Sequence, residues 1–456
     1  MAKKPGIPKG TRDFSPTEVA RRQYIMQTIR HGFEKFGFHP IETPSFENLD
    51  TLLGKYGEEG DRLIFKILNS GDYLSKVDET VLESKNSLKL TNQISEKALR
   101  YDLTVPFARY VVMHQNELDF PFKRYQMQPV WRADRPQKGR YREFYQCDAD
   151  VIGSKSLWQE VEFVTLYDRV FTALGVHGVT IKLNNRKILA GIAEVIDASD
   201  KLIDFTVALD KLDKIGEDGV KAEMIEKGIA AESIEKVKAL FNFTGTFEEK
   251  LAKLRVMLAS SEEGLKGVEE LAFVGREVAL IGLQTAKLNL DVTLARGLNY
   301  YTGAIFEIGA PETVQLGSIG GGGRYDDLTG IFGLKDMSGV GISFGLDRIY
   351  LVMEELNLFP ETVSASSKAM FLNMGEEEMS YGVQAVMKLR DAGIRTEVYP
   401  DKAKVGKQFQ FADKKGIPYA VLVGSQEMAD QKYTLKELAS GEQEVLSLEE
   451  LIAKLK

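Results

Sequence analysis

The clearest alternation of polar and apolar positions lies in two neighbouring segments. Residues 124–134 and 141–151 are typical of two antiparallel strands, joined by a basic loop that contains proline and glycine. In the second strand Gln146, Asp148 and Asp150 share one face, and the residues between them are apolar. The pattern predicts a strand with one acidic face and one core face. A solvated sheet face and a ligand site both fit the acidic side.

Helical spacing dominates other parts of the chain. Residues 157–174 predict one long helix. Residues 186–288 are rich in Lys, Glu, Ala and Leu with the same spacing, so they predict a mainly helical insertion. Residues 69–92 are polar and predict an exposed excursion.

The C-terminal part alternates between strand and helix patterns. The expected elements are strand 369–374, helix 379–392, strand 394–399, helix 405–415 and strand 419–423. Ser447 and Glu450 form a capping box at the start of a final helix. This order predicts a small, mostly parallel α/β domain.

Composition sets broad limits on the protein. With 456 residues the chain is long enough for two or three domains with sizeable cores. The net charge of −8 means that nucleic acid has to be met by local basic patches. The single cysteine excludes an intrachain disulfide, and no apolar run approaches the roughly 20 residues of a membrane span. A cytoplasmic protein with no membrane partner and no signal peptide is expected.

Two glycine-containing segments give the strongest indication of chemistry. Residues 294–303 hold Arg296 followed by Tyr300 and Tyr301, and residues 317–326 hold four consecutive glycines that open onto Arg-Tyr-Asp. Four glycines are costly in a plain scaffold, because each loses backbone entropy when it is ordered. We therefore expect a loop that lets a ligand come close. The alternative is a hairpin turn with incidental tyrosines.

Two arginines are placed where a bound anion would explain them. Arg132 is expected to lie over the acidic strand face, which suits an anionic or zwitterionic ligand. Residues 338–351 predict a small-residue strand followed by an amphipathic helix, with Arg348 in its first turn. Cations are unfavourable at this positive end of a helix unless an anion such as a phosphate lies beside them. The alternative is a surface arginine paired with Asp347 or Asp326.

Together these segments resemble the signature motifs of histidyl-tRNA synthetases, a family of class II aminoacyl-tRNA synthetases. The strand pair resembles motif 2, the glycine-containing segments resemble the two histidine-specific signatures, and the segment of Arg348 resembles motif 3. Residues 9–13, 37–44 and 100–106 give further matches, the second of them in the motif 1 region. The resemblance covers nearly the whole chain in family order.

The fold that this resemblance implies is a multidomain α+β fold. A class II antiparallel β-sheet flanked by helices would form the catalytic domain, which is interrupted by a helical insertion and followed by an α/β anticodon-binding domain. The expected boundaries are 1–185 for the first part of the catalytic domain, 186–288 for the insertion, 289–358 for the second part, 359–368 for a linker and 369–456 for the anticodon-binding domain.

The implied activity is that of a histidine–tRNA ligase (EC 6.1.1.21). ATP and L-histidine give histidyl-adenylate and pyrophosphate, and histidine is then transferred to the 3′ end of tRNA(His). The resemblance assigns Arg132 and Arg296 to the α-phosphate and Arg348 to the β/γ end. Arg140 is assigned to ATP as well. Mg²⁺ is expected to accompany ATP, and the sequence does not single out a residue that holds it.

The family's histidine pocket needs polar groups for the α-ammonium and for the imidazole ring. The resemblance gives the histidine-binding residues as Asp102, Leu103, Thr104, Gln146, Asp150, Tyr300 and Tyr301. Of these residues, the resemblance assigns Asp150 and the two tyrosines to the imidazole ring. The two tyrosines would point to opposite faces of a regular strand, so one of them is expected to lie farther from the ligand. Two positions depart from the family: Asn299 stands where many members have Asp, and Asp150 where some bacterial members have Glu.

The resemblance also implies contacts with tRNA and with a second copy of the chain. Arg135, Gln137 and Lys138 of the motif 2 loop would meet the acceptor end. The C-terminal domain would read the anticodon, with the lysines of residues 402–415 on phosphates or, alternatively, on a solvated helix face. A homodimer is expected.

Two other interpretations compete with this one. A catalytically inactive regulatory subunit of ATP phosphoribosyltransferase would keep the synthetase fold, but it predicts eroded arginines and no anticodon domain. Arg132, Arg296, Arg348 and a C-terminal segment are all present. Another class II synthetase would lack the signature of residues 296–301.

Overall fold

The computed structural model describes residues 4–55, 57–295, 301–363 and 367–456. The chain divides into two compact units, one made of residues 1–13 and 22–360 and the other of residues 14–21 and 361–456. None of the described helices is long and apolar enough to cross a membrane.

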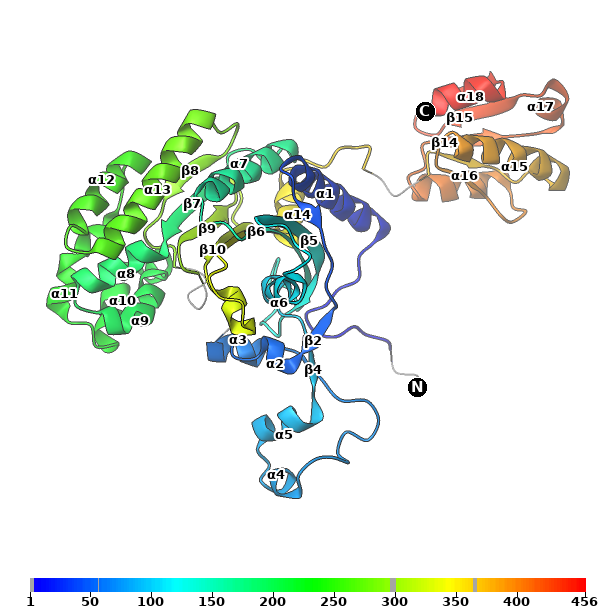
Figure 1. The fold of residues 1–456 in the computed structure, drawn as a ribbon. Helices are drawn as coiled ribbons and strands as arrows, with labels where there is room; N and C mark the ends of the chain where they lie inside the picture. The colour runs from blue at the N-terminus through cyan, green and yellow to red at the C-terminus, as the bar shows by residue number, and fades with distance from the viewer. Residues whose placement is uncertain (1–3, 56, 296–300, 364–366) are drawn as a thin grey trace. The chain divides into compact units, whose positions relative to one another are not determined.

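The larger unit is built on an eight-stranded sheet with the order β1-β5-β6-β11-β10-β9-β7-β8 (Figure 1). The strands are β1 (His39–Pro40), β5 (Phe122–Trp131), β6 (Glu143–Ile152), β7 (Thr180–Asn185), β8 (Lys287–Leu290), β9 (Ala304–Gly309), β10 (Gly320–Tyr325) and β11 (Gly339–Gly345). The inner pairs are antiparallel, and the pairs at the two edges, β1–β5 and β7–β8, are parallel. The predicted strand pair is confirmed as β5 and β6.

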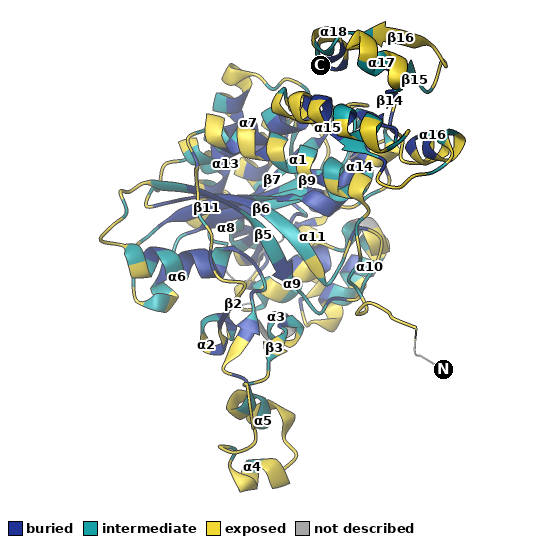
Figure 2. Cartoon of the chain, turned by 90° about the vertical axis from the view of Figure 1, so that its right-hand side faces the viewer, coloured by how far each residue is buried: buried dark blue, intermediate teal, exposed yellow. Residues whose placement is uncertain are grey.

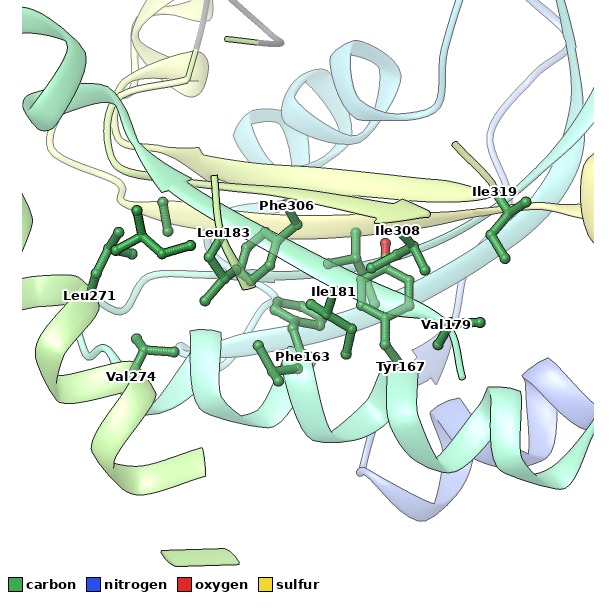
Figure 3. Close-up of a cluster of buried hydrophobic side chains, with 14 of the residues drawn as sticks. Phe163, Tyr167, Val179, Ile181, Leu183, Leu271, Val274, Phe306, Ile308 and Ile319 are labelled. Atoms are coloured by element: carbon green, nitrogen blue, oxygen red, sulfur yellow. The ribbon is translucent and has the colours of Figure 1, made fainter. Parts of the chain in front are cut away.

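Helices surround this sheet. Those outside the insertion are α1 (Pro16–Lys35), α2 (Leu49–Leu52), α3 (Gly57–Leu63), α4 (Glu79–Glu83), α5 (Ser87–Ile94), α6 (Thr104–His114), α7 (Trp158–Ala173), the 3₁₀ helix η3 (Leu328–Phe332) and α14 (Leu346–Glu355). The predicted long helix is confirmed as α7. Figure 3 shows its Phe163 and Tyr167 packed against Ile181 of β7 and Ile308 of β9. The apolar face of the sheet therefore carries the main core.

A three-stranded sheet, β2-β4-β3, carries the predicted excursion. Its strands are β2 (Phe46–Asn48), β3 (Lys66–Ile67) and β4 (Lys97–Leu99). Between β3 and β4 the chain forms α4 and α5, neither of which has a buried residue, and Figure 2 shows them mostly exposed. The expectation of an exposed excursion is confirmed.

Helices fill residues 186–281, as their spacing predicts. They are α8 (Arg186–Val195), η1 (Ser199–Lys201), α9 (Leu202–Leu209), α10 (Leu212–Glu226), α11 (Ala231–Lys236), η2 (Lys238–Asn242), α12 (Phe247–Met257) and α13 (Glu262–Ile281). Ile188 of α8 and Leu271 of α13 belong to the same buried cluster as Leu183 and Phe306 of the sheet. The helices thus share one core with the eight-stranded sheet.

The four consecutive glycines form most of β10 in the middle of the sheet, so the expected loop is wrong. The neighbouring backbones come too close for side chains. A Cβ atom on Gly322 would lie 2.1 Å from the carbonyl oxygen of Gly341, and one on Gly323 would lie 2.8 Å from the ring of Tyr301. Close strand packing, rather than a flexible turn, explains this run of glycines.

The smaller unit contains a five-stranded sheet with the order β13-β12-β14-β15-β16. Its elements are β12 (Ala369–Phe371), α15 (Glu376–Asp391), β13 (Thr396–Val398), α16 (Val405–Lys414), β14 (Tyr419–Leu422), α17 (Ser425–Asp430), β15 (Tyr433–Glu437), β16 (Gln443–Leu446) and α18 (Leu448–Leu455). The predicted alternation and the capping box of α18 are confirmed. The expectation of a mostly parallel sheet is wrong, because β14, β15 and β16 pair antiparallel. The sequence of β16 is largely polar, so it did not predict a strand.

The packing of β10 makes Gly322 sensitive to a single methyl group. We expect Gly322→Ala to lower the free energy of unfolding by about 3 kcal/mol, because β10 and β11 have to separate to admit the Cβ atom. Gly309→Ala, in neighbouring β9, is the matched control, since its Cβ would meet no atom closer than 3.8 Å. Denaturant unfolding monitored by circular dichroism measures both. Equal losses in the two variants would contradict this account of β10.

Candidate active site

The polar face of β6 forms one wall of an acidic cavity of about 290 Å³. Asp148 and Asp150 line it with 3% and 2% of their surfaces exposed, and Asp102 lines it from the segment just before α6. The other polar and aromatic side chains around the cavity are Tyr101, Thr104, Arg132, Gln146, Tyr301, Tyr325 and Ser343. On the opposite face, Cys147 and Ala149 are buried in the core. The predicted alternation is confirmed, and the acidic face is enclosed rather than solvated.

Asp150 is held by two partners. Arg124 lies directly opposite on β5 and forms an ion pair with it at 2.7 Å. Tyr325 of β10 donates its hydroxyl hydrogen to Asp150 at 2.6 Å. Burial raises the pKa of Asp150, while Arg124 and Tyr325 oppose the shift. A carboxylate at this depth is therefore stabilised by one cation and one phenol.

Asp148 is placed differently from Asp150. In the described part of the chain it forms no ion pair, and its hydrogen-bond partners are Gln146, at 3.5 Å, and the hydroxyl of Ser343. Burial raises the pKa of Asp148 from 3.8 to about 7; Arg124 opposes this shift and the carboxylate of Asp150 adds to it. Asp148 therefore changes charge near neutral pH in the ligand-free protein.

The small residues of β11 make room for these carboxylates. Gly341 lies directly opposite Asp150 in the sheet. A Cβ atom on Gly341 would lie 1.9 Å from Oδ1 of Asp150. The small-residue strand that the sequence predicts is thus needed for the cavity itself.

A second cavity, of about 570 Å³, adjoins the first and shares Arg132, Gln146 and Tyr301 with it. Nε of Arg132 donates to the carbonyl oxygen of Tyr101 at 3.0 Å, and Nη2 lies 3.5 Å from Oε1 of Gln146. The guanidinium carbon is 4.3 Å from the ring centre of Tyr101 and 5.2 Å from that of Phe144. Arg132 therefore lies over the acidic strand, as predicted, and stands at the junction of the two cavities.

Arg348 lines the second cavity from the first turn of α14, as predicted. It donates to the carbonyl oxygens of Ser318, at 2.5 Å, and of Gly139, at 3.4 Å. Its neighbour Asp347 forms an ion pair with Arg22 of α1 instead. These contacts orient Arg348 along the wall of the second cavity.

The motif 2 loop between β5 and β6 closes one side of this cavity. Arg140 lines the cavity and contacts both carboxylate oxygens of Asp134, at 3.0 and 3.1 Å. The N-terminal segment holds the loop in place. Arg12 donates a hydrogen bond to the hydroxyl of Tyr141 at 3.2 Å. The backbone amide of Arg142 donates to the carbonyl oxygen of Gly10 at 2.8 Å. Residues 9–13 thus support the loop.

Arg324, which follows the glycine run, supports the site without lining either cavity. It forms a buried ion pair with Glu160 of α7 through two hydrogen bonds of 2.5 and 2.6 Å. The carbonyl oxygen of Arg324 accepts a hydrogen bond from the backbone amide of Thr302 at 2.8 Å. This pair anchors β10 and the segment that carries Tyr301.

Several predicted residues lie elsewhere. Arg296, Asn299 and Tyr300 fall outside the described residues. Leu103 is fully buried and lines neither cavity; its carbonyl oxygen accepts a hydrogen bond from Arg124.

The residues predicted to meet the acceptor end, Arg135, Gln137 and Lys138, are exposed on the motif 2 loop. None of them lines the two cavities. Lys138 lies 3.9 Å from Glu355 of α14. Their exposure leaves them accessible to a large partner.

The sequence did not predict several residues of the acidic cavity or its support, among them Arg124, Asp148 and Tyr325. Asp148 shares a face with Gln146 and Asp150, so the alternation already placed it there. Arg124 is the cross-strand neighbour of Asp150, and opposite charges at such positions attract one another. The register of the two strands, which would have shown this pairing, was not predicted.

Comparisons with known proteins show the family of this chain. The histidyl-tRNA synthetase family profile matches residues 10–79 and 72–349, and the anticodon binding domain profile matches residues 368–456. The chain is 70% identical to a histidine–tRNA ligase of Flavobacterium johnsoniae over 99% of both proteins. It is 58% identical to that of Phocaeicola vulgatus over 100% of both.

Solved structures show the same fold. The histidyl-tRNA synthetase of Nostoc sp. PCC 7120 is 33% identical, with a TM-score of 0.83 over 100% of this chain and 99% of that one. A Bacillus halodurans protein described as an ATP phosphoribosyltransferase regulatory subunit/histidyl-tRNA synthetase is 18% identical. Its TM-score is 0.72 over 92% of this chain and 99% of that one, which shows a shared fold alone.

The large sheet and the anticodon-binding domain that follows it have the fold of a class II aminoacyl-tRNA synthetase. The full-length matches are more specific. The chain belongs to the histidyl-tRNA synthetase family, and its activity is histidine–tRNA ligation with ATP. The interpretation as an inactive regulatory subunit is therefore not supported.

The raised pKa of Asp148 predicts how the stability of the ligand-free protein depends on pH. The folded state keeps a proton on Asp148 up to about pH 7, whereas the unfolded state releases it near pH 3.8, so this group destabilises the fold progressively as pH rises between those values. Asp148→Asn removes the effect. The variant should gain more thermal stability at pH 7.5 than at pH 5, with roughly 4 kcal/mol as the upper limit. A gain independent of pH, measured by calorimetry, would contradict the shift.

Proposed function

We propose that the acidic cavity binds L-histidine, that the adjoining cavity binds ATP, and that histidyl-adenylate forms where the two meet. The observation that carries this proposal is their common wall, to which Arg132 and Gln146 contribute. A histidine whose carboxylate reaches this wall would face the α-phosphate of ATP. Holding the two reacting groups in this way converts a bimolecular step into an effectively unimolecular one.

On the ATP side, guanidinium groups stabilise the charge that accumulates on the phosphates. Arg132 is assigned to the α-phosphate, together with Arg296 approaching from the histidine side. Arg348 is assigned to the β/γ end, and Arg140 contacts ATP at the loop. Loss of one such donor typically costs a factor of about 10² to 10³ in rate.

On the histidine side, Asp102, Thr104 and Gln146 are assigned to the α-ammonium group. Asp150 and Tyr301 are assigned to the imidazole ring, with Tyr300 as the second tyrosine of the signature. Leu103 contributes through its position between Asp102 and Thr104. A buried polar pocket rejects apolar analogues by roughly 10⁴-fold or more, because its own groups would be left unpaired.

Mg²⁺ is proposed to enter with ATP. Among the described residues there is no cluster of three or more His, Cys, Asp or Glu side chains suited to a metal ion. The carboxylates that line the ATP cavity, Asp134 and Asp347, are engaged by Arg140 and Arg22. Within the described parts of the chain these side chains therefore do not form a ready magnesium site, and the phosphates of ATP are the natural ligands of the ion.

The contacts with tRNA(His) are assigned to two exposed regions. Arg135, Gln137 and Lys138 would meet the acceptor end near the ATP cavity. In the anticodon-binding domain, the lysines at 402, 404, 407, 414 and 415 are all exposed. Positive charge on this segment supports phosphate contacts despite the net charge of −8.

A homodimer in the cytoplasm completes the proposal. β1, in the motif 1 region, lies at the edge of the large sheet, and both of its residues are exposed. An unpaired sheet edge is a ready surface for a second copy of the chain. Cys147 is a buried, free thiol, which is compatible with a reducing compartment.

Replacement of Arg132 tests where adenylate formation occurs. Arg132→Ala should lower the rate of histidine-dependent pyrophosphate exchange by about 10² to 10³, because its guanidinium acts on the charged transition state. Arg135→Ala is the matched control from the same loop; it should keep pyrophosphate exchange and impair tRNA charging. Exchange within about threefold of the parent in Arg132→Ala would rule out the proposed role.

Removal of residues 361–456 tests the division of labour between the two units. The arginines assigned to activation all precede this boundary, so pyrophosphate exchange should largely persist, while charging of tRNA(His) should fall steeply with the loss of phosphate contacts. Both reactions are measured after sedimentation has established that the oligomeric state is unchanged. If charging survived while exchange were lost, the division of labour would be refuted.

A further inference from the structure

The segment of residues 100–102 lies beside the end of β5 and meets Arg132 at the junction of the two cavities. Its middle residue, Tyr101, lines the acidic cavity. The carbonyl oxygen of Tyr101 accepts a hydrogen bond from Nε of Arg132 at 3.0 Å, and the guanidinium carbon lies 4.3 Å from the centre of the Tyr101 ring. Tyr101 thus contacts Arg132 through both its backbone and its side chain.

Arg100 anchors one end of this segment. Its side chain is fully buried and donates to the carbonyl oxygens of Thr43 and Pro44, at 2.7 and 3.0 Å. It also donates to the carbonyl oxygen of Pro129 on β5, at 2.8 Å. A guanidinium is a planar group with several donors in a fixed arrangement, so contacts in three places leave it little freedom. The chain just before Tyr101 is therefore fixed to β5.

Asp102 anchors the other end. Its carboxylate accepts the backbone amide of Val105 at 3.1 Å, in the first turn of α6, and its surface is 5% exposed. A carboxylate at this end of a helix satisfies a free N–H group and complements the helix dipole. Tyr101 is thus held on both sides, so its carbonyl oxygen and its ring have defined positions in the ligand-free protein.

The side-chain contact between Tyr101 and Arg132 joins a cation to a neutral aromatic ring. Burial raises the pKa of Tyr101, and the positive charge of Arg132 opposes this shift. The phenol therefore stays protonated at neutral pH. An arginine within about 6 Å of a ring centre is attracted to the ring, and more strongly where water is excluded. The ring of Phe144, at 5.2 Å, is also within this range, but Tyr101 provides the closer ring.

The orientation of Arg132 matters for the chemistry assigned to it. A donor stabilises a charged transition state best when it is already oriented, because no reorganisation is then needed during the reaction. A flexible arginine side chain does not supply this by itself. Here the carbonyl oxygen of Tyr101 holds Nε, and Nη2 lies 3.5 Å from Oε1 of Gln146, which lines both cavities. The contacts with Tyr101 therefore direct the far end of the guanidinium toward the junction.

We propose that Tyr101 is a positioning residue for adenylate formation, which acts through Arg132 by holding its guanidinium at the junction of the two cavities. This inference rests on the proposed role of Arg132 at the α-phosphate. The aromatic ring carries the effect, and the hydroxyl group is not required. Without the ring the guanidinium adopts other orientations, so the transition state loses part of its stabilisation while both substrates still bind.

Pyrophosphate exchange by full-length variants tests the role of the ring. Tyr101→Leu should lower kcat by roughly tenfold, within the range of a desolvated cation–ring contact. The KM values for ATP and histidine should change by less than about threefold, since the lost interaction acts in the transition state. Tyr101→Phe keeps the ring and should restore kcat to within about twofold of the parent. An equal loss in both variants, or a raised histidine KM with unchanged kcat, would overturn the proposal.

A double-mutant cycle shows whether Tyr101 acts through Arg132. In the Arg132→Ala background, Tyr101→Leu should lower exchange by less than about twofold, because the group that it orients is already absent. A general weakening of the fold would instead lower exchange by the same factor in both backgrounds. Losses that multiply in this way would show that Tyr101 does not act through Arg132.

Further variants separate the possible failures. Tyr110→Leu removes a half-buried ring from α6 outside both cavities and should keep the kcat of the parent. Tyr101→Met is a second replacement without a ring, for use if thermal melts show that Tyr101→Leu does not fold. If Arg132→Ala kept the exchange rate of the parent, the proposed role of Arg132 would fail. If Arg132→Ala lost exchange while Tyr101→Leu kept the kcat of the parent, the inference about Tyr101 alone would fail.

Discussion

The ion pair between Arg124 and Asp150 is the contact on which the acidic cavity depends. It joins two neighbouring strands inside the sheet, where removal of one partner from a buried pair typically costs about 3 to 5 kcal/mol. Tyr325 adds a hydrogen bond from β10, so three strands converge on one carboxylate. Arg124 also acts on the neighbouring Asp148, because its positive charge opposes the rise that burial causes in the pKa of that carboxyl. One buried cation therefore influences two carboxylates of the cavity.

Backbone packing sets the shape of the site around this pair. Gly322 and Gly341 allow β10 and β11 to approach closely, and Gly341 also leaves the space that Asp150 occupies. The buried pair of Arg324 and Glu160 then anchors β10 to α7. The two buried ion pairs therefore have different effects. The pair of Arg324 and Glu160 fixes the position of β10. The pair of Arg124 and Asp150 supports the wall of the acidic cavity.

Local patterns in the sequence predicted the elements better than the contacts between them. Period-two alternation placed Gln146, Asp148 and Asp150 on one face, and the helix dipole indicated an anion beside Arg348. The glycine run was wrongly expected to form a loop, because the need for bare backbone arises only when β9 and β11 lie alongside it. The partner of Asp150 depended in the same way on strand register. The assigned roles of Arg296 and Tyr300 lie outside the described residues and stay predictions.

The order of the strands in the chain also determines when the cavity can exist during synthesis. β5 and β6 form a local hairpin, but β6 borders β11, whose residues follow roughly 190 positions later. Such distant pairings are slow, and on the ribosome they wait until the second strand has emerged. Until then Asp150 lacks the neighbour whose missing side chain makes room for its carboxylate, and the hairpin remains open to water. A nascent chain that stops within the insertion lacks β11 and therefore the enclosed cavity in which we propose that the amino acid binds.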